Sequence, residues 1–318
     1  MAKEIISFGT KFNTQSLKGY KLYFLKQDIY LYLMIALPLA FYAIFLYMPM
    51  YGLSIAFKDY NMFSGFLGGE WIGFDVFKEV FKMQQFWYAV RNTLMLNLLS
   101  LIIAFPGPIL LAIMLNEIRN NLAKRFLQSV VYLPYFMSWM IIGGLLTQIL
   151  SENYGIVNIA IKALGLPSVP FLLDEKLWVG TFLGALVWQS SGYNAIIYLA
   201  AITGINPELF EAAAVDGCGR LRAIWHITLP SLKPTIVIML ILNIGNLMNI
   251  GFERAFALQN PVVAKYADVI STFVFRIGIE NGQYSVATAV GLFQSTIAIV
   301  MLVLANFIAK KTGEEGIW

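Results

Sequence analysis

Six long stretches of the chain contain no Asp, Glu, Lys, Arg or His, and this pattern restricts the fold more than any other feature. The shortest stretch has 19 residues, and a helix needs about 20 apolar residues to cross a bilayer. A charged side chain at mid-membrane costs about 2.5–3.5 kcal/mol on insertion scales. The pattern therefore predicts an all-α integral membrane protein with six transmembrane helices. The stretches are Ile29–Phe57, Asn92–Asn116, Phe126–Ser151, Leu177–Pro207, Pro234–Phe252 and Asn281–Ala309.

Composition and charge distribution support a membrane location. Hydrophobic residues make up 59% of the chain and charged residues 13%, about half the charged fraction of a soluble domain. If the N-terminus is cytoplasmic, 13 of the 22 Lys and Arg residues lie in cytoplasmic segments, which are shorter in total than the outer loops. The positive-inside rule then predicts that both termini face the cytoplasm. We expect no removable signal peptide, because no short apolar core precedes a small-residue cleavage site.

Polar and helix-breaking residues interrupt the predicted spans. Pro106 and Pro108 lack backbone donors and should break the second span. The pair Gly143-Gly144 in the third should let another helix approach closely. Tyr193, Asn194, Asn246 and Asn249 also fall within charge-free stretches, and Asn243, Asn246 and Asn249 should share one face of a helix. Two interpretations of these polar residues stay open: hydrogen bonds between helices, or the lining of a substrate pathway.

One loop between the fourth and fifth stretches is predicted to contain a short helix. Asn206 is a good N-cap, Pro207 suits the first helical position, and Gly217 should end the helix. A helix of about ten residues is marginal in water and needs a partner surface. A second short helix is expected from Leu221 to His226.

The residues of this loop resemble a known family signature. Glu211-Ala212-Ala213, Gly217, Ile227, Leu229 and Pro230 match every fixed position of the pattern EAA-x3-G-x9-I-x-L-P. That pattern is characteristic of permease subunits of bacterial ATP-binding-cassette (ABC) importers. Other stretches, among them Tyr51–Tyr60 and Gly251-Phe252-Glu253, resemble the branch that imports oligosaccharides or polysaccharides. Within that branch the chain is similar to alginate importer permeases.

The resemblance implies the type I importer permease fold with a cytoplasmic coupling helix. The residues that would couple to the ATPase are Glu211, Ala212, Ala213, Asp216, Gly217, Ile227, Leu229 and Pro230. The implied partners are a second homologous permease in a heterodimer, two ATP-binding cassette subunits and an extracytoplasmic sugar-binding protein. ATP and magnesium would bind to the partner ATPase, because this chain lacks a phosphate-binding loop motif. The location implied is the bacterial cytoplasmic (inner) membrane.

Three segments are expected along the chain. These are a cytoplasmic N-terminal segment (1–27), a six-span permease domain (28–309) that contains the coupling loop (205–230), and a cytoplasmic tail (310–318).

A group of charged residues is expected near the outer ends of the spans. Glu253 and Arg254 follow the fifth stretch, and Arg91 precedes the second. With Lys265 and Arg276 they are candidates for attracting an anionic polymer. The alternative is that they are solvated loop residues or form salt bridges to a binding protein.

Several classes of function are disfavoured. One His and one Cys cannot form a typical zinc site. The spans hold no acidic or histidine residue for catalysis or ion coupling, which argues against an enzyme and against the main alternative, an ion-coupled secondary sugar transporter. The net charge of +4 gives no reason to expect nucleic acid as a partner.

Overall fold

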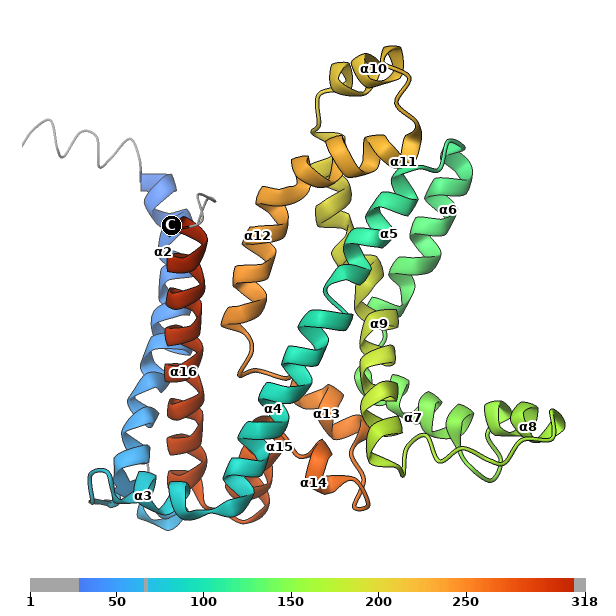
Figure 1. The fold of residues 1–318 in the computed structure, drawn as a ribbon. Helices are drawn as coiled ribbons and strands as arrows, with labels where there is room; N and C mark the ends of the chain where they lie inside the picture. Colours follow the sequence, from blue (N-terminus) through green and yellow to red (C-terminus); the bar gives the residue numbers. More distant parts are fainter. Residues whose placement is uncertain (1–28, 66–67, 312–318) are drawn as a thin grey trace, which may run out of the picture. The chain divides into compact units, whose positions relative to one another are not determined.

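The computed structural model describes residues 29–65 and 68–311 (Figure 1). The predicted segment 1–27 lies outside the described residues, as does most of the predicted tail 310–318. The chain divides into two compact units, one up to Ser54 and one from Ile55 onward.

The first unit is helical throughout its described part. Helix α2 (Ile29–Phe41) continues into the wider turns of η1 (Tyr42–Tyr47) and the tighter turns of η2 (Met48–Phe57), which extends into the second unit. Together they form one run of 29 residues that is long and apolar enough to cross a membrane. Its bounds coincide with the first charge-free stretch.

The second unit begins with a small hairpin and a surface helix. Strand β1 (Lys58–Asp59) pairs antiparallel with β2 (Glu70–Trp71), and η3 (Met62–Ser64) lies between them. Helix α3 (Asp75–Lys82) follows, and its Val76 and Val80 are buried in a cluster with residues of α4, α15 and α16. Phe57 stacks on Trp71 with ring centroids 5.6 Å apart. Phe81 of α3 lies against Phe86 of the next helix and Phe293 of the last one, with ring centroids 5.9 and 5.7 Å away, so this segment packs on longer helices.

The second charge-free stretch is a broken helix, as predicted. Helix α4 (Gln84–Ile103) begins eight residues before Asn92, so its first turns include charged Arg91. Helix α5 (Pro106–Asn116) starts after the break. Near the break, the N–H groups of Ala104 and Phe105 both donate to the carbonyl of Ser100, and neither proline can donate.

The third charge-free stretch is not one straight helix. Helix α6 (Asn121–Tyr132) and the tight turn η4 (Leu133–Phe136) are followed by α7 (Trp139–Leu150), and the two parts are bent by 98°. Pro134 lies at the bend, and the Ser138 hydroxyl starts α7 by accepting from the N–H of Met140 at 3.2 Å. Helix α8 (Ile156–Ala163) follows α7.

Helix α9 (Glu175–Thr203) packs closely against α5 and α6. A Cβ added to Gly107 of α5 would lie 2.7 Å from the Ser191 hydroxyl of α9. A Cβ on Gly192 would lie 1.8 Å from the carbonyl oxygen of Val131 in α6. Small residues thus permit the closest helix contacts. The same holds for Gly143 of α7, where a Cβ would be 2.6 Å from the carbonyl oxygen of Ala257, whereas Gly144 faces open space.

The fifth charge-free stretch is helical only in part. Helix α12 (Leu229–Gly245) ends seven residues before Phe252, and an irregular segment follows it (residues 246–251). Three side chains from other elements donate to its carbonyls: Asn97 to Leu247 at 2.7 Å, Gln294 to Met248 at 2.7 Å, and Ser271 to Ile250 at 3.1 Å. Irregular backbone is tolerated at membrane depth only where such partners satisfy it. Asn97, Gln294 and Ser271 are therefore structural hydrogen-bonding residues.

Short helices lead from this segment to a long final helix. They are α13 (Phe252–Leu258), α14 (Ala264–Ala267), α15 (Ile270–Phe275) and the wide turns of η6 (Arg276–Glu280), and the last is α16 (Tyr284–Lys311). Helix α16 packs along α12, where Gly245 accommodates Leu302.

Among the described residues, four helical stretches are long and apolar enough to span a membrane, and the bent pair α6–α7 would make a fifth. Helix α9 has 29 residues but carries the polar run Gln189–Asn194. The chain is a multi-pass helical membrane protein, and the count of six spans stays a prediction.

Candidate functional site

The predicted helix of the loop 205–230 is present as α10 (Pro207–Val215). The Asn206 side chain caps it by accepting from the N–H of Glu208 at 3.1 Å, and Pro207 occupies the first turn. Gly217 ends the helical segment with φ of +72°, a conformation that suits glycine. The N–H of Cys218 then donates back to the carbonyl of Ala213 at 2.8 Å. The local sequence signals therefore give the expected start and end.

Helix α10 buries none of its residues within the described part of the chain. Figure 1 shows it projecting beyond α11 (Arg220–Ala223) and the start of α12. Glu211, Ala212, Asp216 and Gly217 are exposed, and Ala213 is half-buried. Because so short a helix gains little stability by itself, its exposed surface is suited to a partner.

The second half of the signature lies at the start of α12. Helix α11 runs into the wide turns of η5 (Ile224–Thr228), which contain Ile227. Leu229 and Pro230 then form the first turn of α12, between the buried residues Thr228 and Leu232. This arrangement matches the predicted second short helix, and α11, η5 and α12 follow one another without a break, whereas residues 216–219 form a non-helical connection between α10 and α11.

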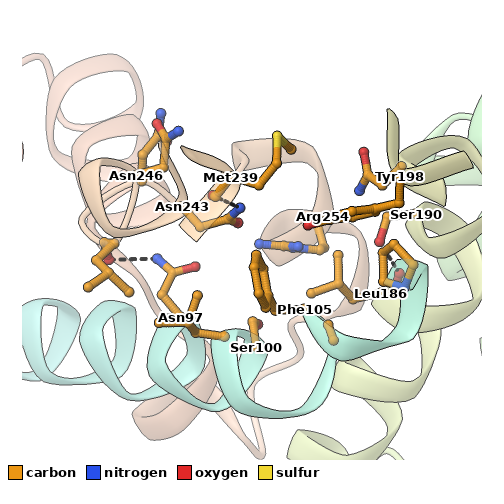
Figure 2. Close-up of a pocket in the computed structure, with 16 residues that line it drawn as sticks. Asn97, Ser100, Phe105, Leu186, Ser190, Tyr198, Met239, Asn243, Asn246 and Arg254 are labelled. Carbon is orange, nitrogen blue, oxygen red and sulfur yellow. Dashed lines mark hydrogen bonds between the residues drawn. The ribbon is translucent and has the colours of Figure 1, made fainter. Parts of the chain in front are cut away.

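A polar cavity of about 220 Å³ lies among α4, α5, α9, α12 and α13 (Figure 2). The two interruptions described above form its wall. Phe105 lies at the break between α4 and α5, Pro108 lies in the first turn of α5, and Asn246 and Asn249 come from the segment after α12. Its polar lining residues are Asn97, Ser100, Ser190, Asn194, Tyr198, Asn243, Asn246, Asn249 and Arg254.

Asn243, Asn246 and Asn249 all line this cavity, but not from one helix face. Asn243 belongs to α12, Asn246 is the residue that caps its end, and Asn249 lies in the irregular segment. The prediction of a shared helix face is therefore wrong for Asn249. The three residues converge because the chain turns at Asn246.

Three asparagine side chains of the cavity each donate one N–H to a backbone carbonyl. Asn97 donates to Leu247, Asn243 to Met239 at 2.7 Å, and Asn246 to Leu242 at 3.0 Å. Their amide oxygens remain as acceptors. The Ser100 and Ser190 hydroxyls likewise donate to helix carbonyls at 2.7 Å. The cavity can therefore accept hydrogen bonds from hydroxyl groups.

Arg254 is the cationic residue of the lining. Its guanidinium carbon lies 5.0 Å from the ring centroid of Phe182 and 5.8 Å from that of Trp139, distances typical of cation–π contacts. Its Nε atom is buried and has no hydrogen-bond partner among the described residues. In Figure 2 the side chain extends toward the part of the cavity that carries Asn97 and Asn243.

Two predicted pathway residues do not line this cavity. Tyr193 stacks on Tyr135 with ring centroids 3.9 Å apart, and Glu253 is exposed beside Arg254. Asn97, Ser100, Ser190 and Tyr198 line the cavity but are not among the pathway residues predicted from the sequence. Each is a polar residue inside a charge-free stretch, and this polarity is the signal that could have indicated them.

The predicted group of outer cations is divided between two places. Lys265 and Arg276 line a separate pocket with Asp268. Arg276 donates to Asp268 Oδ1 at 3.2 Å. Arg91 donates to the side chain of Asn92, and its guanidinium lies against the rings of Tyr88 and Tyr266. Arg254 is thus separate from the other three. No group of His, Cys, Asp and Glu that could hold a metal ion occurs in the described ranges.

Comparisons with known proteins identify the family. Residues 104–313, which contain the loop 205–230 and most of the cavity lining, match the family described as "Binding-protein-dependent transport system inner membrane component". The chain is 44% identical to the polygalacturonan/rhamnogalacturonan transport system permease protein YteP of Bacillus subtilis (strain 168), covering 92% of this chain and 91% of that protein.

The fold also matches solved structures. One is a chain of a bacterial ABC transporter involved in the import of the acidic polysaccharide alginate, with a TM-score of 0.85 and 39% identity, covering 92% of this chain and 99% of that chain. A second, with the same TM-score and identity, covers 92% and 98% and comes from a bacterial alginate ABC transporter in complex with an alginate pentasaccharide-bound periplasmic protein. The chain belongs to the family of binding-protein-dependent transport system inner membrane components, and it is a permease.

Proposed function

We propose that the chain is one permease subunit of an ATP-driven importer that takes up acidic oligosaccharides or polysaccharides, with alginate as a candidate substrate. The observation that carries this proposal is the exposed helix α10, which bears the permease signature and has no buried residue within the described chain. Family membership supports the same function.

Helix α10 is proposed to dock into a cleft on a cytoplasmic ATPase subunit. Glu211, Ala212, Ala213, Asp216 and Gly217 form the docking surface. Ile227, Leu229 and Pro230 connect it to α12, whose other end carries Asn243 and leads to Asn246. A displacement of α10 driven by ATP would therefore reach the wall of the polar cavity.

The relatives and the cavity support the proposed substrate class. Polygalacturonan and alginate, named for two similar proteins, both carry carboxylates on their sugar units. The cavity combines amide oxygens, which can accept from sugar hydroxyls, with one guanidinium. Asn194, Asn246, Asn249 and Arg254 are proposed to contact the passing sugar. Tyr193 and Glu253, also predicted from the sequence, would contact it only outside this cavity.

The remaining parts of the importer lie on other chains in this proposal. A second, related permease would complete the pathway as a heterodimer, two ATP-binding cassette subunits would hold ATP and magnesium, and an extracytoplasmic sugar-binding protein would deliver the substrate. The location proposed is the bacterial cytoplasmic membrane, with both termini cytoplasmic. The segments 1–27, 28–309 and 310–318 keep the roles predicted from the sequence.

Reversing a charge on α10 tests the coupling. We expect Glu211→Lys to insert and assemble normally but to abolish substrate uptake into proteoliposomes, because a lysine would oppose the docking contact. The control is Asp75→Lys, which reverses an exposed charge in α3 and should leave uptake within about twofold, as surface ion pairs contribute little. Normal uptake by Glu211→Lys would refute the proposed role of α10.

A further inference from the structure

Arg254 carries a charge that the described part of the protein does not neutralise. Arginine stays protonated at any physiological pH, and a buried charge is costly unless it is paired. The salt bridges among the described residues do not include Arg254, and its buried Nε atom has no hydrogen-bond partner among them. Trp139 and Phe182 stabilise the cation by their ring faces, but they supply no counter-charge.

The other cations of this region differ from Arg254. The guanidinium of Arg276 is paired with Asp268 through two nitrogen atoms. Arg91 donates to the Asn92 side chain at 3.0 Å. Lys265 is exposed, and solvent therefore screens its charge. Arg254 alone of these four faces the polar cavity, so its charge is available to an anion that enters.

The chemistry around Arg254 suits a carboxylate-bearing sugar. Asn97, Asn243 and Asn246 each donate one side-chain N–H to a backbone carbonyl, and their amide oxygens remain as acceptors for hydroxyls. A carboxylate has no proton to offer such acceptors and needs a donor. The guanidinium can supply two parallel N–H groups to it, the geometry that makes arginine selective for carboxylates.

We propose that Arg254 is a specificity-determining residue that recognises the carboxylate of an acidic sugar within the pathway, an inference that rests on the proposed function. Its ring contacts hold the guanidinium in place before the ligand arrives. Preorganisation of this kind improves affinity because less side-chain freedom is lost on binding.

Equilibrium binding separates this role from a structural one. The complete importer, purified in detergent without its binding protein, is titrated by calorimetry with a uronate trisaccharide and with its carboxyl-reduced, neutral counterpart. The wild type should bind the acidic sugar about tenfold more tightly. Arg254→Gln should remove this preference while keeping affinity for the neutral sugar. Arg254→Lys retains the charge and should keep part of the preference.

The matched control is Lys265→Gln, which removes the same charge from an exposed position and should keep the preference. The inference is overturned if the wild type shows no preference for the acidic sugar, or if Arg254→Gln keeps that preference. It is also overturned if Arg254→Gln and Arg254→Lys both lose affinity equally for the acidic and the neutral sugar. Failure of the proposed function appears separately, as absence of uronate uptake by the wild-type importer with its binding protein in liposomes.

Discussion

The contact between α9 and α6 at Gly192 gives the sharpest prediction about the fold. A Cβ at position 192 would lie 1.8 Å from the carbonyl oxygen and 2.5 Å from the carbonyl carbon of Val131. An ordinary contact between such atoms is about 3.4 Å, so Gly192→Ala must separate the two helices by roughly 1.5 Å. The obstructing atoms are backbone, which cannot move aside by changing a rotamer.

The cost can be estimated from what the displacement disturbs. Overpacking of a tight interior typically costs about 1–3 kcal/mol. The displacement also strains the hydrogen bond from Gln189 to the carbonyl of Tyr135, which is 3.2 Å long, and the stacking of Tyr135 on Tyr193. We therefore expect Gly192→Ala to lower the free energy of unfolding by about 2–3 kcal/mol.

Helix α9 supplies its own control. Gly184 has no atom within 4 Å of an added Cβ, and alanine is a better helix former than glycine by about 1 kcal/mol. Gly184→Ala should therefore leave stability unchanged or raise it. Both variants are measured by reversible unfolding of the purified protein in mixed detergent. Equal stability of Gly192→Ala and Gly184→Ala would refute the helix contact described here.

Two further predictions concern local hydrogen bonds. Asn206→Ala removes the cap of α10 and should destabilise that helix by about 1 kcal/mol, which hydrogen exchange would detect as faster exchange of its first amides. Asn206→Asp keeps an acceptor and should exchange as slowly as the wild type. Unchanged exchange in the alanine variant would contradict the capping role. Asp268→Asn weakens the pairing with Arg276 and Thr272 and should cost about 2 kcal/mol of unfolding free energy. Asp75→Asn, which weakens an exposed pair with Lys78, should lower the unfolding free energy by no more than about 0.5 kcal/mol. Equal losses of stability in Asp268→Asn and Asp75→Asn would contradict a structural role for the pairing of Asp268.

The sequence predicts those helix bounds and helix breaks that individual residues determine by themselves. The absence of charge locates the first and last long helices closely, at Ile29–Phe57 and Tyr284–Lys311. Pro106 and Pro108 identify the break between α4 and α5, and Asn206 and Gly217 bound α10. In each case the residue itself removes a donor, supplies a cap or adopts the required backbone conformation.

Contacts between distant residues explain what the sequence did not predict. The segment 246–251 is as free of charge as a helix, yet it is irregular, because Asn97 and Gln294 satisfy its carbonyls from 150 and 46 residues away. Charge-free sequence shows only that a segment avoids charge, not that it is helical. The 98° bend after α6 is a second example, since Pro134 marks its place but not its angle.

The sequence predicts only some of the residues that line the polar cavity. Asn194, Asn246, Asn249 and Arg254 are polar or charged residues in or beside apolar stretches, and all four line it. Tyr193 is also a polar residue within an apolar stretch but packs on Tyr135. Which side of a helix faces a cavity depends on its neighbours, and a single sequence does not state which helices are neighbours.

The measurement that tests the central proposal most directly is ATP hydrolysis by the complete importer in lipid, with and without its binding protein loaded with defined sugars. If this chain is the permease of an acidic-sugar importer, uronate oligomers should stimulate hydrolysis, and neutral oligomers of the same length should stimulate it less. Stimulation by neutral sugars alone would contradict the acidic substrate, and a rate independent of binding protein and sugar would contradict the importer itself.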